Sequence, residues 1–417
     1  MRNLPDSHRA DDYLVAGMGS VTSGSASRSL APNSPAGQPI PEIRGLETEH
    51  AVAVVSPEVY SLFLDARGSL ARTLEFAGTT AIMLVNYREP PADESRRDGE
   101  ITSFLCSADV FRQLQSKHSN CSPERLGFQL LSEILDGGIL VDRVLAVQLP
   151  MRKPRVAPSL PDSARVIIAH RGCANHLAMA LRSIDLAPSP RPNVSVGLDG
   201  AIGPEYDALL QQHGGIDFFE FSPAPVGPYV IRQELIQRST EPLLIFQDSD
   251  DYATWDRLSH LQNEIQATAC DLAGSHEIRV DQISGRATAV RYPLDVNAAL
   301  KSGPAHALLH GTSAVSRNAF FRAGGLSTDQ RFGSDTQFLL RAYFSLRIRN
   351  ADAFLYLRRI HKEALTVHPS TGFTAPERET LRRQKMADFQ AVKNGRISLE
   401  DSSLRPVFRT GYQVSRL

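Results

Sequence analysis

Short apolar runs and helical spacings of apolar residues alternate along the second half of this chain. The runs, which are rich in β-branched residues, predict buried strands at 164–170, 193–200, 215–222 and 242–247. Apolar residues that recur three or four positions apart predict helices at 173–186, 229–239 and 254–266. Because strands that alternate with helices pair in parallel, this pattern predicts a mostly parallel, Rossmann-type sheet flanked by helices, an α/β fold. In such a sheet the ligand site lies beyond the carboxyl ends of the strands.

The composition and apolar pattern of the first 163 residues predict a tail, a smaller α/β region and a linker. Ser, Gly, Ala and Pro dominate the tail, which buries too little apolar area to offset its chain entropy and is expected to be disordered. The smaller region predicts strands at 51–56 and 81–87 and helices at 107–115 and 123–135. The expected division is a tail at 1–45, a small α/β domain at 46–150, a proline-rich linker at 151–163, the main domain at 164–385 and an extension at 386–417.

Two segments of the chain resemble each other. Residues 99–113 and 310–323 each contain a Thr-Ser pair with Phe-Arg nine residues further on, and each is followed by Arg-x-Gly and a helix start with Gln and Leu. The small domain could therefore be a vestigial half-repeat of the main domain. Chance similarity explains the same pattern nearly as well.

Composition and charge narrow the classes of function. The 417 residues include 45 basic and 46 acidic ones, so no basic field predicts nucleic acid binding. Four scattered cysteines predict free thiols in a reducing compartment. No apolar run approaches the about 20 residues of a transmembrane helix, and the start lacks the apolar region of a signal peptide. We expect a cytoplasmic protein without a transmembrane segment, with peripheral membrane association left open.

The candidate chemistry centres on the acidic tetrad, Asp248-Ser249-Asp250-Asp251, which follows the apolar run at 242–247. In an extended chain Asp248 and Asp250 point to the same side, so both could converge on one ligand. Carboxylates so close repel each other unless they share a cation, and hard divalent cations prefer oxygen ligands. Such a metal would bridge the phosphates of a nucleotide. The plainer interpretation is an acidic turn that caps the following helix.

The region around the tetrad, FQDSDDYATWDRL, resembles the Asp-x-Asp region of family 2 glycosyltransferases, which have the GT-A fold. Further stretches resemble the family's landmarks in the same order, and together they span about residues 163–385: ARVIIAHRGCANHLAMALRSI, VGLDGA, VGPYVIRQ, FFRAGGLSTDQRFGSDTQFLLRAY and LYLRRIHKEALTVHPSTG. The chain departs from the family pattern at His170-Arg171, Leu198, Ala201 and Ser334.

The resemblance implies a role for each matching residue. It implies that the donor is bound by Asp199, Gly200, Gly227, Arg232, Asp248 and Arg359. It implies that Mn²⁺ or Mg²⁺ is held by Asp248, Asp250 and His361. It also implies that Asp335 is the base that deprotonates the acceptor hydroxyl. Asp335 fits equally the first-turn acid of a helix, where the dipole favours a negative charge. His310, before Gly311-Thr312, is a further candidate for the site.

The function predicted from these residues is a metal-dependent glycosyltransferase. By resemblance it is inverting, and it transfers a sugar from a nucleoside-diphosphate sugar to a hydroxyl of a glycan or glycolipid-type acceptor. Two alternatives remain open. The departures from the family pattern favour a catalytically inactive nucleotide-sugar-binding module. A nucleotidyltransferase also uses acidic residues on a doubly wound sheet, but residues 170–176 form a poor version of the loop that would receive a triphosphate.

Overall fold

Two compact units make up the chain in the computed structural model. The first unit comprises residues 1–88, 99–155 and 284–289, and the second comprises 89–98, 156–283 and 290–417. The residues that the structure describes are 14–18, 51–56, 59–63, 65–66, 70, 79–86, 88–89, 91–92, 95–149, 163–188, 190–200, 202–303 and 306–417. The expected linker at 151–163 and most of the expected tail at 1–45 therefore lie outside the described residues. Within the tail, Leu14–Met18 form strand β1.

The first unit is built on a five-stranded sheet in the order β1-β2-β5-β3-β6. After β1, its strands are β2 (Ala51–Val55), β3 (Thr80–Asn86), β5 (Phe104–Ser107) and β6 (Arg143–Leu149). Strands β3 and β6 pair in parallel, and the other pairs are antiparallel. Helices α2 (Ala108–Lys117) and α3 (Pro123–Leu135) follow β5. The two strands and two helices expected from the sequence are present, whereas β5 and β6 were not predicted.

The two segments that resemble each other in sequence also form the same local structure. Each Thr-Ser pair precedes a short strand, β5 in the first unit and β14 (Ala314–Ser316) in the second, and then a helix, α2 or α9 (Arg317–Arg322). A serine side chain caps each helix. The Leu84 amide donates to the Ser103 carbonyl, and the Phe246 amide donates to the Ser313 carbonyl, both at 2.9 Å. The half-repeat remains a prediction.

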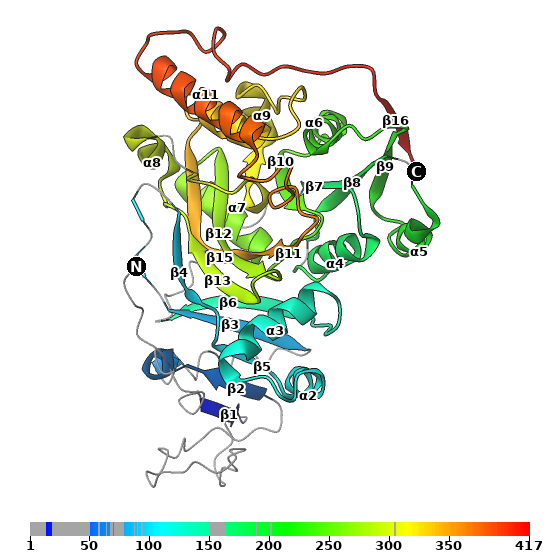
Figure 1. Ribbon diagram of the computed structural model, residues 1–417, viewed down its shortest axis with the longest axis vertical. Helices are drawn as coiled ribbons and strands as arrows, with labels where there is room; N and C mark the ends of the chain where they lie inside the picture. The colour runs from blue at the N-terminus through cyan, green and yellow to red at the C-terminus, as the bar shows by residue number, and fades with distance from the viewer. Residues whose placement is uncertain are drawn as a thin grey trace. The chain divides into compact units, whose positions relative to one another are not determined.

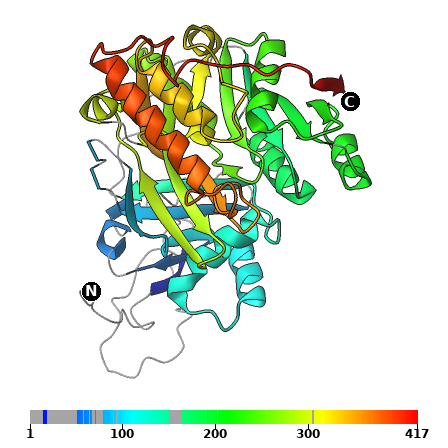
Figure 2. The ribbon, with the colours of Figure 1, turned by 45° about the horizontal axis from the view of Figure 1, so that its top comes forward.

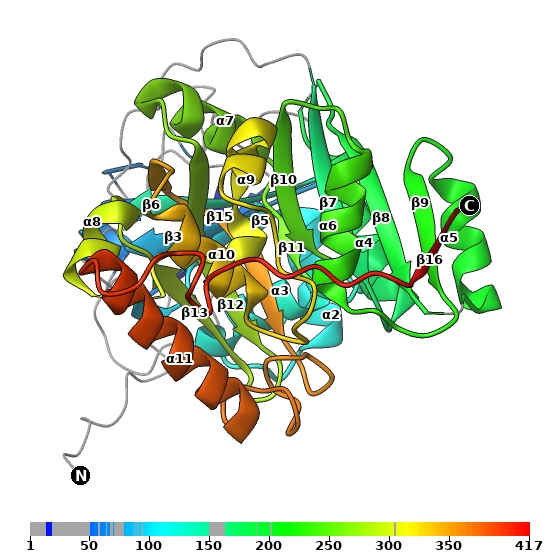
Figure 3. The same cartoon turned by 90° about the horizontal axis from the view of Figure 1, so that it is seen from above.

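The second unit contains the predicted alternation of strands and helices. Its sheet follows the path β11-β15-β12-β14-β10-β7-β8-β9-β16 (Figures 1 and 3). The strands predicted from the sequence form a parallel block of β7 (Ala164–His170), β8 (Asn193–Asp199), β9 (Asp217–Ser222) and β10 (Leu243–Asp248). Their carboxyl ends therefore meet at one edge, as the fold class requires.

Strands on either side of the parallel block make the sheet mixed. These are β11 (Tyr252–Ala253), β12 (Leu272–Asp281), β14, β15 (Ile348–Ile360) and β16 (Gln413–Arg416). Strands β12 and β15 pair in parallel, whereas β14 and β16 pair antiparallel with β10 and β9. Two more strands, β4 (Arg96–Glu100) and β13 (Arg286–Arg291), each have residues in both units.

Helices cover both faces of the sheet of the second unit. One face packs against α4 (Ala174–Asp185), α5 (Asp207–Gln212) and α7 (Arg257–Thr268), next to the 3₁₀ turn η2 (Pro204–Tyr206). The other face packs against α6 (Pro228–Arg238), α8 (Val296–Ser302), α9, α10 (Ser334–Ala342) and α11 (Pro376–Lys393). Successive residues of β10 alternate between the two cores, since Leu244 and Phe246 lie in one and Leu243 and Ile245 in the other. The predicted α/β class, with helices flanking the sheet, is therefore confirmed.

The last residues of the chain form an extended segment of the second unit. After α11 the chain, red in Figure 2, runs along the unit to β16, which pairs with the edge strand β9. Among the described residues, no helix is both long enough and apolar enough to cross a membrane.

Candidate functional site

The acidic tetrad lies at the carboxyl end of the parallel block. Strand β10 ends at Asp248, and the next three residues form a turn before β11 begins at Tyr252. The chain is therefore not extended from Asp248 to Asp250, and the convergence of the two carboxylates on one ligand stays a prediction. Because the chain turns immediately after Asp248, the strand alternation no longer applies, and the two carboxylates meet different partners.

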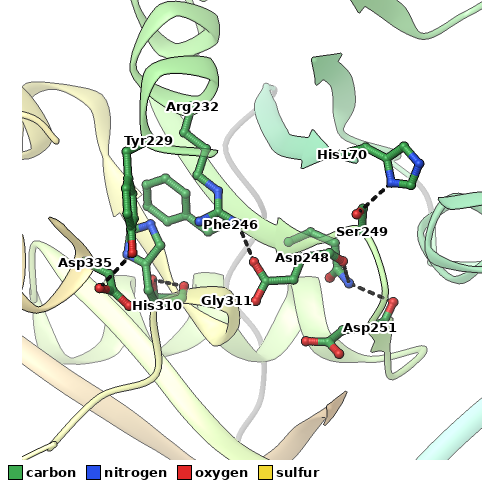
Figure 4. Close-up of polar contacts among 12 residues, drawn as sticks. His170, Tyr229, Arg232, Phe246, Asp248, Ser249, Asp251, His310, Gly311 and Asp335 are labelled. Atoms are coloured by element: carbon green, nitrogen blue, oxygen red, sulfur yellow. Dashed lines mark hydrogen bonds and ion pairs between the residues drawn. The ribbon is translucent and has the colours of Figure 1, made fainter. Parts of the chain in front are cut away.

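Asp248 pairs with Arg232 of helix α6 (Figure 4). Arg232 is buried, and although burial lowers its pKa, the charge of Asp248 outweighs that effect and holds the pKa above its usual range. The Asp248 carboxylate also borders Gly311. A β-carbon added at Gly311 would lie 2.8 Å from Oδ2 of Asp248 and 2.9 Å from the hydroxyl of Tyr356. Two residues predicted to bind the donor, Arg232 and Asp248, are thus in direct contact.

Asp199, at the end of β8, contacts the backbone that leads into α6. Its Oδ1 accepts hydrogen bonds from the amides of Val226, at 2.6 Å, and Gly227, at 3.2 Å. Gly227 is the N-cap of α6 with a φ of 90°, a left-handed conformation that favours glycine. Gly200 follows Asp199 with a φ of 105°, and its amide donates to the Phe221 carbonyl. Three residues predicted for the donor side, Asp199, Gly200 and Gly227, therefore lie around the start of α6, and Asp199 holds the loop through its hydrogen bonds to two backbone amides.

Asp250 contacts residues at the end of β15. Its Oδ2 lies 2.9 Å from Nε2 of His361, and its carbonyl accepts a hydrogen bond from Nε of Arg359 at 3.0 Å. Burial pushes the pKa of Asp250 up, but the hydrogen bond and charge of His361 outweigh this effect and lower it. The same hydrogen bond raises the pKa of His361. His361 thus contacts one of the expected metal ligands, and the Arg359 side chain hydrogen-bonds the backbone of the turn.

Asp251 is buried beneath the turn. Its Oδ1 accepts a hydrogen bond of 2.7 Å from the amide of Arg359, so it ties the tetrad to β15. It does not cap the next helix, because α7 begins at Arg257 with Asp256 as its N-cap. Burial raises the pKa of Asp251, and the carboxylates of Asp250 and Asp248 raise it further.

The tetrad suits a hard divalent cation in its chemistry. Carboxylate oxygens are the ligands that Mn²⁺ and Mg²⁺ prefer, and a shared cation would relieve the repulsion that raises the pKa of Asp251. Within the described ranges, no group of three or more His, Cys, Asp and Glu side chains has an arrangement that could hold a metal. Asp248 and Asp250 instead face Arg232 and His361. The residue types therefore suit a cation, but in the present rotamers Asp248 is paired with Arg232 and Asp250 with His361.

Asp335 lies in the first turn of α10. Its Oδ1 accepts hydrogen bonds from the amide of Thr336, at 2.8 Å, and from the hydroxyl of Tyr229, at 3.1 Å. Burial acts to raise the pKa of Asp335, and the surrounding positive groups and the Thr336 amide lower it on balance. Burial holds the imidazole of His310 neutral, so it contributes no charge. We therefore assign the lowering of the Asp335 pKa to the Thr336 amide and to Arg378. Asp335 is therefore an ionised carboxylate in the first turn of a helix, where the dipole also favours it.

His310 lies between Asp335 and the pair formed by Arg232 and Asp248 (Figure 4). It is 7% exposed, and its ring stacks on Phe246 with 3.9 Å between the ring centroids. Burial lowers the pKa of His310 to about 3, and the nearby guanidinium of Arg232 contributes to the lowering. The imidazole is therefore neutral at physiological pH.

His170, which departs from the family pattern, holds the tetrad in place. Its Nδ1 and Nε2 lie 2.8 Å from the hydroxyls of Ser249 and Tyr206, respectively. Tyr206 donates its own proton to the Gly172 carbonyl at 2.7 Å, so it accepts from Nε2, and Nδ1 accepts from Ser249. Burial lowers the pKa of His170 to about 4, which is consistent with this neutral form. His170 is thus a structural support of the turn.

Three contributors to the site were not identified from the sequence. Tyr229 reaches Asp335, and the hydroxyl of Tyr356 accepts a hydrogen bond from the Asp248 amide at 3.0 Å. Arg257 is 1% exposed and donates to the carbonyls of Phe246 and Gly311, at 2.6 and 2.8 Å. Tyr229 and Tyr356 lie inside apolar patterns, and Arg257 lies in a helix that reads as amphipathic. Only the pairing of distant segments brings them to the tetrad.

Comparisons with known proteins give limited information. No protein-family model matches the sequence, and no curated protein matches it either. Among solved structures, a crystal structure of S. aureus TarS 1-349 is 14% identical, with a TM-score of 0.40, over 57% of this chain and 74% of that chain. The same fragment in complex with UDP-GlcNAc gives 14% identity and a TM-score of 0.41 over 56% of this chain and 74% of that chain. Similarity at this level carries no argument about this chain, so the interpretation rests on the geometry described above.

Proposed function

We propose that this protein is a glycosyltransferase that transfers a sugar from a nucleoside-diphosphate sugar to a hydroxyl of a glycan or glycolipid-type acceptor. The observation that carries the proposal is the position of two side chains one turn apart on α6. Arg232 contacts Asp248 of the tetrad, and Tyr229 contacts Asp335. Residues three apart on a helix are neighbours with about 5–6 Å between their β-carbons. The expected donor carboxylate and the expected base therefore contact adjacent positions on one helix.

Each group has a chemical task in this reaction. Asp248 and Asp250, with His361, would hold Mn²⁺ or Mg²⁺, which when bound neutralises charge on the leaving diphosphate. Arg232 stays charged and adds a positive group beside Asp248. Asp335 stays ionised, so it can accept the proton of the acceptor hydroxyl as that oxygen attacks the anomeric carbon. Attack from the side opposite the leaving group would invert the anomeric configuration, and inversion is part of the proposal.

A panel of nucleotide sugars tests the donor half of the proposal. UDP-GlcNAc, UDP-glucose and GDP-mannose, each with and without Mn²⁺, would be screened by thermal shift. A ligand at a hundredfold excess over its dissociation constant stabilises the folded state by about 2.7 kcal/mol, which is readily measured. We expect at least one donor to raise the melting temperature, more strongly with Mn²⁺. A panel with no shift in either condition would contradict the donor site.

The substitution Asp335→Asn separates an enzyme from an inactive binding module. Loss of a general base slows turnover by about 10²–10⁴-fold. Donor affinity should stay within about twofold of the wild type, because the carboxylate is assigned to the acceptor side. Asp329→Asn, an exposed carboxylate in the preceding loop, is the matched control and should leave turnover unchanged. Donor binding by a wild-type protein that neither transfers nor hydrolyses any donor would favour the binding module.

A further inference from the structure

His310 has a buried nitrogen without a partner at the centre of the candidate site. Among the described residues, Nε2 of His310 makes no hydrogen bond, although the side chain is more than nine-tenths buried. Leaving a buried polar atom unsatisfied costs about 1–3 kcal/mol. Such an atom at a candidate site indicates that a bound molecule completes its hydrogen bonding.

The position of His310 restricts what that molecule can be. The next residue, Gly311, lies against the tetrad so closely that a β-carbon would collide with the carboxylate of Asp248. On the other side the imidazole lies beside Tyr229 and Asp335 (Figure 4). His310 therefore occupies the space between the groups assigned to the diphosphate and the group assigned to the acceptor hydroxyl. In a sugar-transfer reaction, the sugar of the donor must lie between those two groups.

Packing fixes the imidazole in this position. Its ring is stacked at 36° on Phe246, and its edge faces Phe338 with the ring planes at 78°. The hydrogen-bonded backbone turn η3 (His310–Thr312) holds the main chain, since the His310 carbonyl accepts from the Ser313 amide at 3.0 Å. Because Nε2 has almost no accessible surface in this structure, a ligand reaches it only when neighbouring side chains shift, whereas the packed ring itself stays in position.

We propose that Nε2 of His310 hydrogen-bonds a hydroxyl or amide of the donor's sugar ring and is a specificity-determining residue of the site. This inference rests on the proposed function and names a contact within it. The imidazole is neutral, so Nε2 offers either one donor or one acceptor, and a sugar hydroxyl can complement either. His310 recognises the sugar and is not assigned a proton-transfer role, which belongs to Asp335.

Three substitutions and two kinds of ligand test the assignment. His310→Gln places an amide nitrogen near the position of Nε2, His310→Asn places it near Nδ1, and His310→Phe keeps the stacked ring without nitrogen. Calorimetry would measure the affinity of each variant for a nucleotide sugar and for the matching free nucleotide. The pairs are UDP-GlcNAc and UDP, UDP-glucose and UDP, and GDP-mannose and GDP, restricted to those that the wild type binds. Far-UV circular dichroism and melting temperature would establish that each variant folds.

We expect His310→Asn and His310→Phe to weaken binding of the nucleotide sugar by about tenfold, the effect of losing one hydrogen bond to a buried group. Binding of the free nucleoside diphosphate should change by less than about twofold, and His310→Gln should restore most of the sugar affinity. The comparison of Gln with Asn keeps the test decisive if the Phe variant does not fold.

Several outcomes would overturn the inference. An equal loss for sugar and free nucleotide would indicate a structural role, and an unchanged donor affinity with a raised KM for the acceptor would place His310 on the acceptor side. A wild-type protein that binds none of the nucleotide sugars would contradict the proposed function itself. Wild-type binding that His310→Phe and His310→Asn leave unchanged would contradict only the role of His310.

Discussion

Tyr229 and Arg232, both on α6, each contact one carboxylate of the site. Each of them leaves the helix in the direction of a different carboxylate, Asp335 or Asp248. Both side chains are buried, so neither contact is easily replaced by water. The affinity for a charged ligand is therefore coupled to one ion pair, Arg232–Asp248, and one hydrogen bond, Tyr229–Asp335, and each can be tested separately.

Arg232→Met should destabilise the protein because it leaves the Asp248 carboxylate without its partner. Removing one member of a buried pair costs about 3–5 kcal/mol, and the partial exposure of Asp248 reduces this to about 1–3 kcal/mol. Adding Asp248→Asn should recover part of the loss, because the uncompensated charge disappears. Urea unfolding of the wild type, the two single variants and the double variant measures the coupling. Strictly additive losses would show that the pair does not contribute.

The pair formed by Asp250 and His361 should make stability depend on pH. The folded state raises the pKa of His361, so its contribution is complete below its unfolded pKa of about 6.5 and is lost as the pH rises through the higher folded value. The folded state lowers the pKa of Asp250, so that contribution is present above about pH 3.9 and is lost as the pH falls further. The difference in free energy of unfolding between wild type and His361→Gln should therefore be largest between about pH 4 and 6.5.

Urea unfolding across the pH range, in EDTA, measures this difference. The variant Asp250→Asn/His361→Gln should depend less on pH than His361→Gln, because the single variant leaves the Asp250 carboxylate without its partner, and burial then raises its pKa. A difference that grows above pH 7 would contradict the assigned pairing.

At the scale of elements, the η3 turn lies against the end of β10. Gly311 has no room for a side chain, because the nearest atoms belong to Asp248 and Tyr356. Gly311→Ala should displace the Asp248 carboxylate, cost about 1–3 kcal/mol of stability and weaken donor binding by about tenfold. Gly215→Ala is the matched control, since nothing lies within 4 Å of its added β-carbon, and we expect a change within about 0.5 kcal/mol.

Thermal unfolding and calorimetric titration of both glycine variants provide the measurements. Equal behaviour of the two variants would show that the approach of η3 to the tetrad is not a constraint.

Similar backbone hydrogen bonds in the two units allow their sequences to be compared at the tetrad. If the hydrogen bond from Leu84 to Ser103 corresponds to that from Phe246 to Ser313, then Asn86 takes the place of Asp248. Arg88 and Glu89 then correspond to Asp250 and Asp251. Asn86 and Arg88 are not acidic, so this stretch has no acidic tetrad, and the half-repeat stays a prediction.

At the scale of the molecule, the C-terminal segment stabilises the helix that carries Asp335. Arg341 of α10 is 3% exposed and donates to carbonyls of Ala323, Gly325 and Leu404. Burial lowers its pKa to about 10, and among the described residues no carboxylate is hydrogen-bonded to it. The carbonyl of Leu404 is therefore part of the compensation for a buried charge.

Truncation after Ser402 should cost about 3–5 kcal/mol, because it leaves donors of Arg341 unsatisfied and removes the buried side chain of Leu404. Truncation after Gly411 removes β16 with its pairing to β9, and Tyr412 with its hydrogen bond to Glu234, and should cost about 1–2 kcal/mol. Urea unfolding would rank the two shortened chains, and turnover should fall only in the longer truncation. Equal losses would place the stabilising contacts in β16.

The sequence by itself determined the elements of the main unit and the residue types of its site. Period-two and helical patterns are local, so β7, β8, β9, β10, α4 and α6 follow from burial of one face or both. The acidic tetrad could also be placed at a strand end, because strand polarity fixes which edge carries the loops. The strands β12 and β15 were not predicted, because their polar residues interrupt the apolar pattern. Both strands contain buried charged residues.

Only the tertiary structure decided which partners these residues meet. Arg232 meets Asp248, His361 meets Asp250 and His310 stacks on Phe246 through contacts between segments 16 to 111 residues apart. Such contacts depend on how helices and strands pack, and no local pattern records that packing. The turn after Asp248 gives Asp248 and Asp250 different partners, and the neutral state of His310 follows from burial. The sequence thus supplied the chemistry of the site, and packing determined its geometry and its protonation.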